Sequence, residues 1–139
     1  SEEDVRFALR HRLSMVCSDG SVIAFGRGCP HPRNYRAFTK ALATYVRDES
    51  VLTLEQAVHK MSGLPAWKMG LSDRGVIRPG AKADIAVFDY WGLGYKSDFG
   101  DPHHYSEGMV HVLVNGKFAI RDGQFVAEGM AGRTLRRDP

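Results

Sequence analysis

The sequence predicts an α+β protein, with helices in its first half and antiparallel strands in its second half. Two observations support this prediction. Apolar residues recur at helical spacing up to about residue 70, and after that point short apolar runs are separated by Pro-Gly, Asn-Gly and Asp-Gly pairs. With 139 residues, of which 43% are hydrophobic, the chain is long enough to bury a core in one domain.

The first expected elements are a helix over residues 2–12 and a short strand over residues 13–17. Acidic residues occupy the first turn of the helix, where they suit the positive end of the helix dipole. Residues 13–17, LSMVC, are mostly apolar, as in a strand that is buried on both faces. This run ends in Ser18, Asp19 and Gly20, so that a carboxylate stands where an apolar strand is expected to stop.

A loop over residues 18–34 follows, and glycines and prolines recur along it. Ordered loops of this length are more often functional than connective. After the loop, an apolar stripe predicts an amphipathic helix over residues 35–49.

Two shorter helices are expected next. Thr53 and Gln56 have the spacing of a capping box and predict a helix over residues 53–63, with Gly63 at its end. A further helix is expected to begin with Pro65 at its first position and to end near Gly70.

The second half of the chain has the pattern of antiparallel strands and tight turns. We expect a short strand, a turn at Pro79-Gly80 and a strand over residues 83–89. Two further runs meet at Asn115-Gly116, a pair that suits a tight hairpin, and a second turn is expected at Asp122-Gly123.

Charge and cysteine content argue against several classes of protein. The net charge is +3, and Arg133, Arg136 and Arg137 contribute to the excess near the end of the chain. No aromatic residues alternate with these arginines, so a solvated tail is favoured over a nucleic-acid interface. Cys17 and Cys29 have no zinc-ligand spacing and are too few for a disulfide framework, so we expect reduced thiols, with Cys29 buried.

The chain has no apolar stretch of the roughly 20 residues that a membrane helix needs, and no signal sequence at its start. We therefore expect no membrane partner and a cytoplasmic location.

Several segments occur together in an informative order: SDG at residues 18–20, PHPRNYRAFTKAL from Pro30, LTLEQAVHKMSGLPAWKMGL, and DPHHY. Between and after them stands the pattern G-x-I-x-x-G-x-x-A-D-x-x-x-F-D, followed by V-x-V-N-G. On these residues, nearly the whole chain resembles the C-terminal part of the metal-dependent amidohydrolases, specifically the N-acyl-D-amino-acid deacylase (D-aminoacylase) branch.

This resemblance implies that residues 1–75 form the end of a (β/α)8 barrel, with its last strand and flanking helices. Residues 76–139 would then form a portion of a small antiparallel β-sandwich. In that family an aspartate at the end of the eighth strand binds the catalytic divalent metal, usually zinc, or its water, and acts as general base. Asp19 matches this position and is therefore the candidate catalytic and metal-binding residue, since barrel active sites lie at the C-terminal ends of strands.

Arg33 is the candidate substrate-binding residue, because a guanidinium group can bind the free carboxylate of an N-acyl amino acid in bidentate fashion. The alternative is that Arg33 is a solvent-exposed surface residue. We expect His31 to shape the loop rather than to bind metal. His103 and His104 are adjacent and would point to opposite sides of an extended chain, so a loop role is expected for both.

A catalytic zinc site takes about three protein ligands, and the family's other ligands would lie N-terminal to this sequence. The chain is therefore expected to be the C-terminal portion of a zinc-dependent enzyme that hydrolyses N-acyl-D-amino acids. It would need the missing barrel part or a second chain for activity and would bind no metal alone. The alternative is a non-catalytic module whose exposed apolar faces close on a second copy as a homodimer.

Overall fold

The computed structural model describes residues 1–126 and 131–136, and the chain divides into two compact units. Unit 1 comprises Ser1–Met61 and Leu93–Glu107, and unit 2 comprises Ser62–Gly92 and Gly108–Pro139. The resemblance implies a boundary after residue 75 between a barrel portion and a sandwich portion, and this boundary stays a prediction. Within the described ranges, every helix is too short or too polar to cross a membrane.

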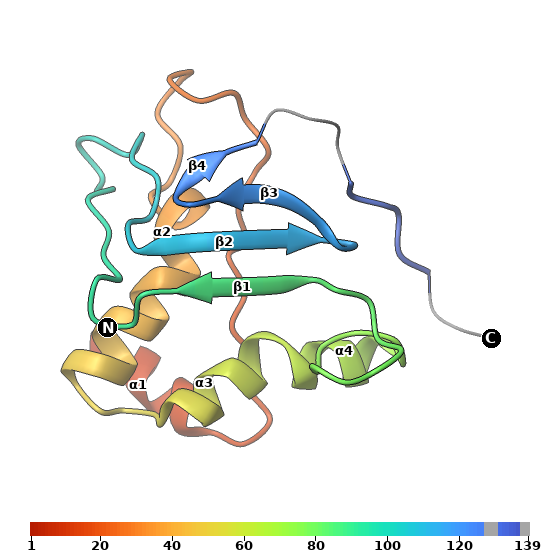
Figure 1. The fold of residues 1–139 in the computed structure, drawn as a ribbon. Coiled ribbons are helices and arrows are strands. Elements are labelled where there is room, and N and C mark those ends of the chain that lie inside the picture. Colours follow the sequence, from red (N-terminus) through yellow and green to blue (C-terminus); the bar gives the residue numbers. More distant parts are fainter. Residues whose placement is uncertain (127–130, 137–139) are drawn as a thin grey trace. The chain divides into compact units, whose positions relative to one another are not determined.

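Unit 1 is mainly helical (Figure 1). α2 (Arg33–Lys40) continues directly into the π-helix η1 (Ala41–Asp48), at whose end the N–H of Glu49 donates to the carbonyl of Thr44, five residues earlier, at 2.9 Å. The helix expected over residues 35–49 is thus confirmed, although it begins at Arg33. The helices of unit 1 are α1 (Glu2–Arg10), α2 (Arg33–Lys40), η1 (Ala41–Asp48) and α3 (Leu54–Met61).

Two of these helices begin with reciprocal caps. At α3, the N–H of Gln56 donates to Thr53 Oγ1 at 3.2 Å, and the N–H of Thr53 donates to Gln56 Oε1 at 3.0 Å. This is the capping box that the sequence predicts. At α1, Ser1 and Asp4 form the equivalent pair of contacts.

The core of unit 1 is built around η1. Burying a Leu or Val side chain contributes roughly 1.5–3 kcal/mol relative to leaving it in water, so this cluster stabilises the unit that also contains Asp19 and Arg33. Its buried apolar residues are Ala41, Leu42, Ala43, Tyr45, Val46, Val51, Leu52, Ala57 and Leu93.

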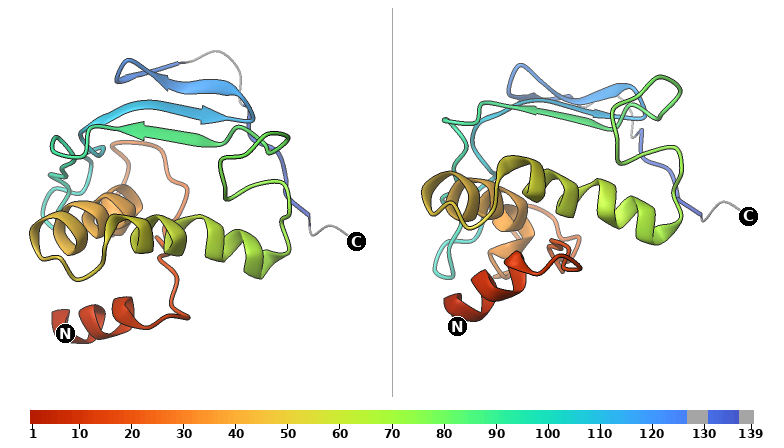
Figure 2. Two further views of the ribbon diagram at one scale, coloured as in Figure 1. Left: turned by 60° about the horizontal axis from the view of Figure 1, so that its bottom comes forward. Right: turned by 90° about the horizontal axis from the view of Figure 1, so that it is seen from below.

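Unit 2 contains one four-stranded antiparallel sheet in the order β1-β2-β3-β4. Its strands form a single layer, which is seen from other directions in Figure 2. β1 lies within the strand expected over residues 83–89. The elements of unit 2 are α4 (Gly63–Met69), β1 (Ile85–Phe88), β2 (Met109–Val114), β3 (Lys117–Arg121) and β4 (Gln124–Phe125).

The two hairpin turns of the sheet are those that the sequence predicts. Asn115 and Gly116 have φ angles of 48° and 80°, and Asp122 and Gly123 have φ angles of 49° and 75°. Positive φ at both central residues is the requirement of the type I′ turn, which Asn-Gly and Asp-Gly pairs satisfy best.

The strand expected over residues 13–17 is wrong. This segment takes part in no β-ladder, and its Val16 N–H instead donates to the carbonyl of Lys60 on α3 at 3.2 Å. A strand needs a neighbouring strand to share its hydrogen bonds, and the described residues of unit 1 contain none. An apolar run alone does not show whether such a neighbour is present.

Two smaller expectations are also wrong. The run before Pro79 is a loop rather than a strand, because the N–H of Lys82 donates to the carbonyl of Asp73 at 2.7 Å and closes the segment on itself. Gly63 is the first residue of α4 rather than the end of α3, so Pro65 occupies the third helical position. The predicted end at Gly70 is confirmed, with φ 70° and ψ 30°.

Candidate functional site

Asp19 lies directly after the 13–17 segment, in the loop that leads to α2. Its φ of 46° is in the left-handed region, which is uncommon for residues other than glycine but is more accessible to Asp and Asn. The N–H of Asp19 donates to Cys17 Sγ at 3.4 Å. The carboxylate side chain is 81% exposed and therefore open to a ligand.

The structure brings the two sequence-predicted site residues together. Arg33, the first residue of α2, places its Nη2 atom 2.8 Å from Oδ2 of Asp19. Its side chain is 44% exposed, so the ion pair lies at the surface of unit 1 rather than in the core. Arg33 is thus paired with a carboxylate rather than with solvent alone.

Asn34 fixes the chain on the C-terminal side of Asp19. The side chain of Asn34 accepts a hydrogen bond from the Ser21 N–H at 3.3 Å and donates one to the Ser21 carbonyl at 3.0 Å. A Cβ atom on Gly20 would lie 3.1 Å from Asn34 Oδ1 and 3.3 Å from its Cα, so this close approach favours glycine. The sequence analysis missed Asn34, whose only signal was its place beside Arg33.

His103 holds the same loop from the segment after Leu93. Its Nδ1 accepts from the N–H of Gly26 at 3.1 Å, so Nε2 carries the proton and donates to the carbonyl of Gly28 at 3.0 Å. The hydroxyl of Tyr35 also lies 2.9 Å from Nδ1. These contacts are those of a residue that shapes a loop.

A cavity of about 310 Å³ opens beside Asp19 and Arg33. Cys29 is exposed and contributes to its lining, which corrects the expectation that this thiol is buried. His31 also lines it, and its Nδ1 accepts from the N–H of Arg33 at 3.0 Å. The lining residues are Asp19, Ser21, Ile23, Arg27, Gly28, Cys29, Pro30, His31, Arg33 and Asn34.

The described residues do not provide a complete metal site. No group of three or more His, Cys, Asp or Glu side chains within residues 1–126 and 131–136 is arranged to hold an ion. Asp19 is the one carboxylate that lines its cavity, and it is paired with Arg33. Because a catalytic zinc takes about three protein ligands, these residues fit one ligand position of such a site and not the whole of it.

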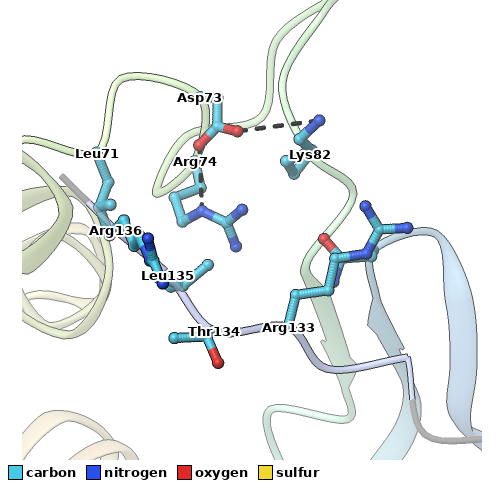
Figure 3. Close-up of a pocket in the computed structure, with 9 residues that line it drawn as sticks. Leu71, Asp73, Arg74, Lys82, Arg133, Thr134, Leu135 and Arg136 are labelled. Atoms are coloured by element: carbon cyan, nitrogen blue, oxygen red, sulfur yellow. Dashed lines mark hydrogen bonds and ion pairs between the residues drawn. The ribbon is translucent and has the colours of Figure 1, made fainter. Parts of the chain in front are cut away.

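A second cavity of about 310 Å³ lies in unit 2 (Figure 3). Arg74, Lys82, Arg133 and Arg136 contribute four cationic side chains to its lining. Asp73 is the one carboxylate among the described residues that line it, and it lies 3.1 Å from Arg74 Nε and 4.0 Å from Lys82 Nζ. The charge of this cavity suits an anion, but its carboxylate is shared between two cations and is poorly placed to accept a proton.

The cluster of arginines near the end of the chain is only partly described. Arg133 and Arg136 line the second cavity, whereas Arg137 lies outside the described residues.

Comparisons with known proteins agree with the resemblance seen in the sequence. The model of the amidohydrolase family matches residues 5–120. The chain is 42% identical over 137 residues to an N-acyl-D-glutamate deacylase of Alcaligenes xylosoxydans xylosoxydans, covering 99% of this chain and 27% of the relative. It is 38% identical to an N-acyl-D-aspartate deacylase of the same organism, covering 96% of this chain and 26% of the relative.

Solved structures give the same result. The fold matches a crystal structure of D-aminoacylase with a TM-score of 0.90 and 38% identity, over 99% of this chain and 28% of that one. It also matches an N-acyl-D-glutamate deacylase from Bordetella bronchiseptica, complexed with zinc and a phosphonate that mimics the tetrahedral intermediate, with a TM-score of 0.86 and 38% identity, over 98% of this chain and 28% of that one. The chain spans just over a quarter of the length of these relatives.

Proposed function

The chain belongs to the amidohydrolase family, and we propose that it supplies the end of the barrel and part of the β-sandwich of a zinc-dependent enzyme that hydrolyses N-acyl-D-amino acids. The observation that carries this proposal is the pairing of Asp19 with Arg33, at 2.8 Å, beside a cavity. A substrate of this class has an amide that is cleaved and a free carboxylate that can be bound. The two residues match these two groups.

Asp19 is the proposed general base. Hydrolysis of an amide requires a group that accepts a proton from the attacking water and then returns it to the leaving nitrogen. The water oxygen forms a bond to the carbonyl carbon, the C–N bond breaks, and the proton held by the Asp19 carboxylate passes to the amine. The exposed side chain at the cavity is accessible for both transfers.

Arg33 is the proposed ligand of the substrate carboxylate. A guanidinium group binds a carboxylate through two parallel hydrogen bonds, and the resulting contact fixes orientation as well as adding affinity. Without substrate, Arg33 pairs with Asp19. We infer that the substrate carboxylate takes the place of Asp19 at Arg33, which releases Oδ2 of Asp19 when the amide arrives.

Zinc is part of the proposal for the whole enzyme. The described residues offer Asp19 as one ligand, so the remaining ligands would come from the rest of a longer protein or from another chain. The roles proposed for Asp19 and Arg33 toward proton and carboxylate follow from their own chemistry.

The test is a chimera in which this chain replaces the matching segment of the Alcaligenes N-acyl-D-glutamate deacylase. We expect the chimera to hydrolyse N-acetyl-D-glutamate, and we expect Asp19→Asn to lower kcat by about 10³-fold, within the range that general bases contribute. Glu3→Gln is the matched control, since it removes a carboxylate of unit 1 far along the chain from the loop. An Asp19→Asn chimera with the kcat of the parent chimera would overturn the proposal.

A further inference from the structure

We propose that Lys60 on α3 is a positioning residue for Asp19, an inference that rests on the role proposed above for that carboxylate. Lys60 is 5% exposed, which is rare for a lysine. It lies far from Asp19 in the sequence, and the sequence analysis gave it no role. The hydrogen bonds of its side chain go to His11 and Ser14, in the segment that leads to the site.

The ammonium group of Lys60 uses its three donors on this one segment. Nζ lies 2.6 Å from the carbonyl of His11, 3.2 Å from the carbonyl of Ser14 and 3.0 Å from Ser14 Oγ. His11 is the C-cap residue of α1, at a helix end, where backbone carbonyls lack helical partners and favour a cation. The side chain therefore joins the end of α1 to the start of the 13–17 segment.

The main chain of Lys60 extends the same attachment. Its carbonyl accepts the N–H of Val16 at 3.2 Å, three residues before Asp19. The described part of unit 1 has no strand beside this segment, so Lys60 provides hydrogen bonds that a neighbouring strand would otherwise supply. Lys60 fixes the chain before Asp19, and Asn34 fixes it after Asp19.

The choice of a lysine here is informative because burial disfavours its charge. Burial lowers the pKa of Lys60 below its ordinary value. A methionine would fill similar space without this desolvation, but it would remove the ammonium donor from the Ser14 carbonyl and from Ser14 Oγ. The His11 carbonyl would keep the N–H and the hydroxyl of Ser14 as donors, at 3.1 and 2.8 Å. The lysine at this position is therefore explained by its hydrogen bonds to His11 and Ser14 rather than by its packing.

The first test uses the 139-residue chain itself. Lys60→Met is compared with Ala57→Gly, which weakens the same helix at a fully buried position and removes no side-chain hydrogen bond to residues 11–16. We expect amide hydrogen exchange at Val16 and Asp19 to be at least about tenfold faster in Lys60→Met than in Ala57→Gly, because only the former removes the local attachment. Equal exchange at these two amides in both variants would overturn the proposal.

The second test uses the chimera. We expect Lys60→Met to lower kcat by about 10²-fold with KM changed by less than about twofold, as a displaced catalytic group would. Ala57→Gly should leave kcat unchanged, and Lys60→Arg, which keeps the donors, should recover part of the loss. In an Asp19→Asn background, Lys60→Met should cost nothing further, since Lys60 acts through Asp19. A full further loss in that background would contradict the positioning role.

The two proposals can fail separately. An inactive parent chimera, or one insensitive to Asp19→Asn, would reject the proposed function. The hydrogen exchange of Val16 and Asp19 in the isolated chain would still decide whether Lys60 holds the segment.

Discussion

Unit 1 and unit 2 are stabilised in different ways. Of the ten buried hydrophobic residues other than proline among those described, nine belong to unit 1, whereas Ala66 belongs to unit 2. The side chains of β2, the second strand of the sheet, are all half-buried. Unit 1 therefore depends on packing between distant segments, and unit 2 depends more on local hairpins and their turns.

This difference explains where the candidate site is placed. Asp19 and Arg33 belong to the unit in which a packed core supports the helices that present Lys60 to residues 11–16 and Asn34 to the loop. A functional group needs rigid support to within a fraction of an ångström, and buried contacts provide it better than an exposed loop does. Four changes test the comparison between the units, in decreasing order of expected effect.

Leu42→Ala should have the largest effect on stability. Leu42 is buried in the core of unit 1, and deleting its side chain should cost about 2–5 kcal/mol by lost transfer energy and cavity formation. Leu113→Ala, the same change at a half-buried position of β2, is the matched comparison and should cost clearly less. Thermal and urea unfolding measure both. Equal losses would mean that the two units do not differ in packing.

Gly20→Ala should have the next largest effect, and it should act on the site as well as on stability. The added Cβ would approach Asn34 at 3.1 and 3.3 Å, which should cost about 1–3 kcal/mol as overpacking. The chimera should also lose activity, because Asp19 is the preceding residue. Gly100→Ala is the control, since its added Cβ would make only an ordinary contact at 3.5 Å. A Gly20→Ala chimera with unchanged kcat would show that this approach does not support Asp19.

Gly116→Ala should weaken the sheet of unit 2. No atom lies within 4 Å of the added Cβ, so the cost arises from the φ of 80° alone and should be about 1–2 kcal/mol. Gly132→Ala, which also enters open space but has no positive φ, is the control. Faster hydrogen exchange in β2 and β3, with η1 unchanged, is the expected result. Loss of protection in η1 would contradict the assignment of this effect to the hairpin of unit 2.

The smallest expected effect is on the attachment of α1 to the core of unit 1. Lys40 donates to Glu2 Oε1 at 2.8 Å and Tyr45 donates to Oε2 at 2.5 Å, and these hydrogen bonds lower the pKa of Glu2. Because the folded pKa is lowered, the stabilisation is present above the ordinary glutamate pKa of about 4.3 and is lost as the pH falls through the folded value.

Hydrogen exchange in α1 should therefore increase on acidification below about pH 4.3, the ordinary glutamate value. Glu2→Gln should reduce this pH dependence of hydrogen exchange in α1, whereas Glu3→Gln, on the same helix, should retain it. An identical acid response in both variants would assign the effect to other carboxylates.

Local features of this fold could be predicted from the sequence. The capping box of Thr53 and Gln56, the left-handed Gly70 and the two type I′ turns each depend on a few adjacent residues, and all are present in the structure. Features that depend on distant partners were missed. The strand expected over residues 13–17 has no neighbour in the described part of unit 1, and the segment is held by Lys60 on α3 instead.

The same contrast between local features and contacts of distant residues holds for the candidate site. Asp19 and Arg33 were identified because their segments resemble the family, whereas the residues alone show only a carboxylate after an apolar run. The ion pair of Asp19 and Arg33, at 2.8 Å, depends on how α2 and α3 pack, which no local pattern encodes. The hydrogen bonds by which Asn34 and Lys60 hold the chain on either side of Asp19 depend on the same packing. The two candidate site residues could thus be found from the sequence, whereas the residues that hold them could not.

The most direct test of the account asks whether Asp19 and Arg33 act on different parts of one substrate. The measurement is kcat/KM of the parent, Asp19→Asn and Arg33→Met chimeras on N-acetyl-D-glutamate and on its α-carboxamide, which lacks the carboxylate that Arg33 would bind. We expect Asp19→Asn to lower kcat/KM equally for both substrates, and Arg33→Met to lower it only for the acid. An equal loss for both substrates in Arg33→Met, or no loss in Asp19→Asn, would contradict this expectation.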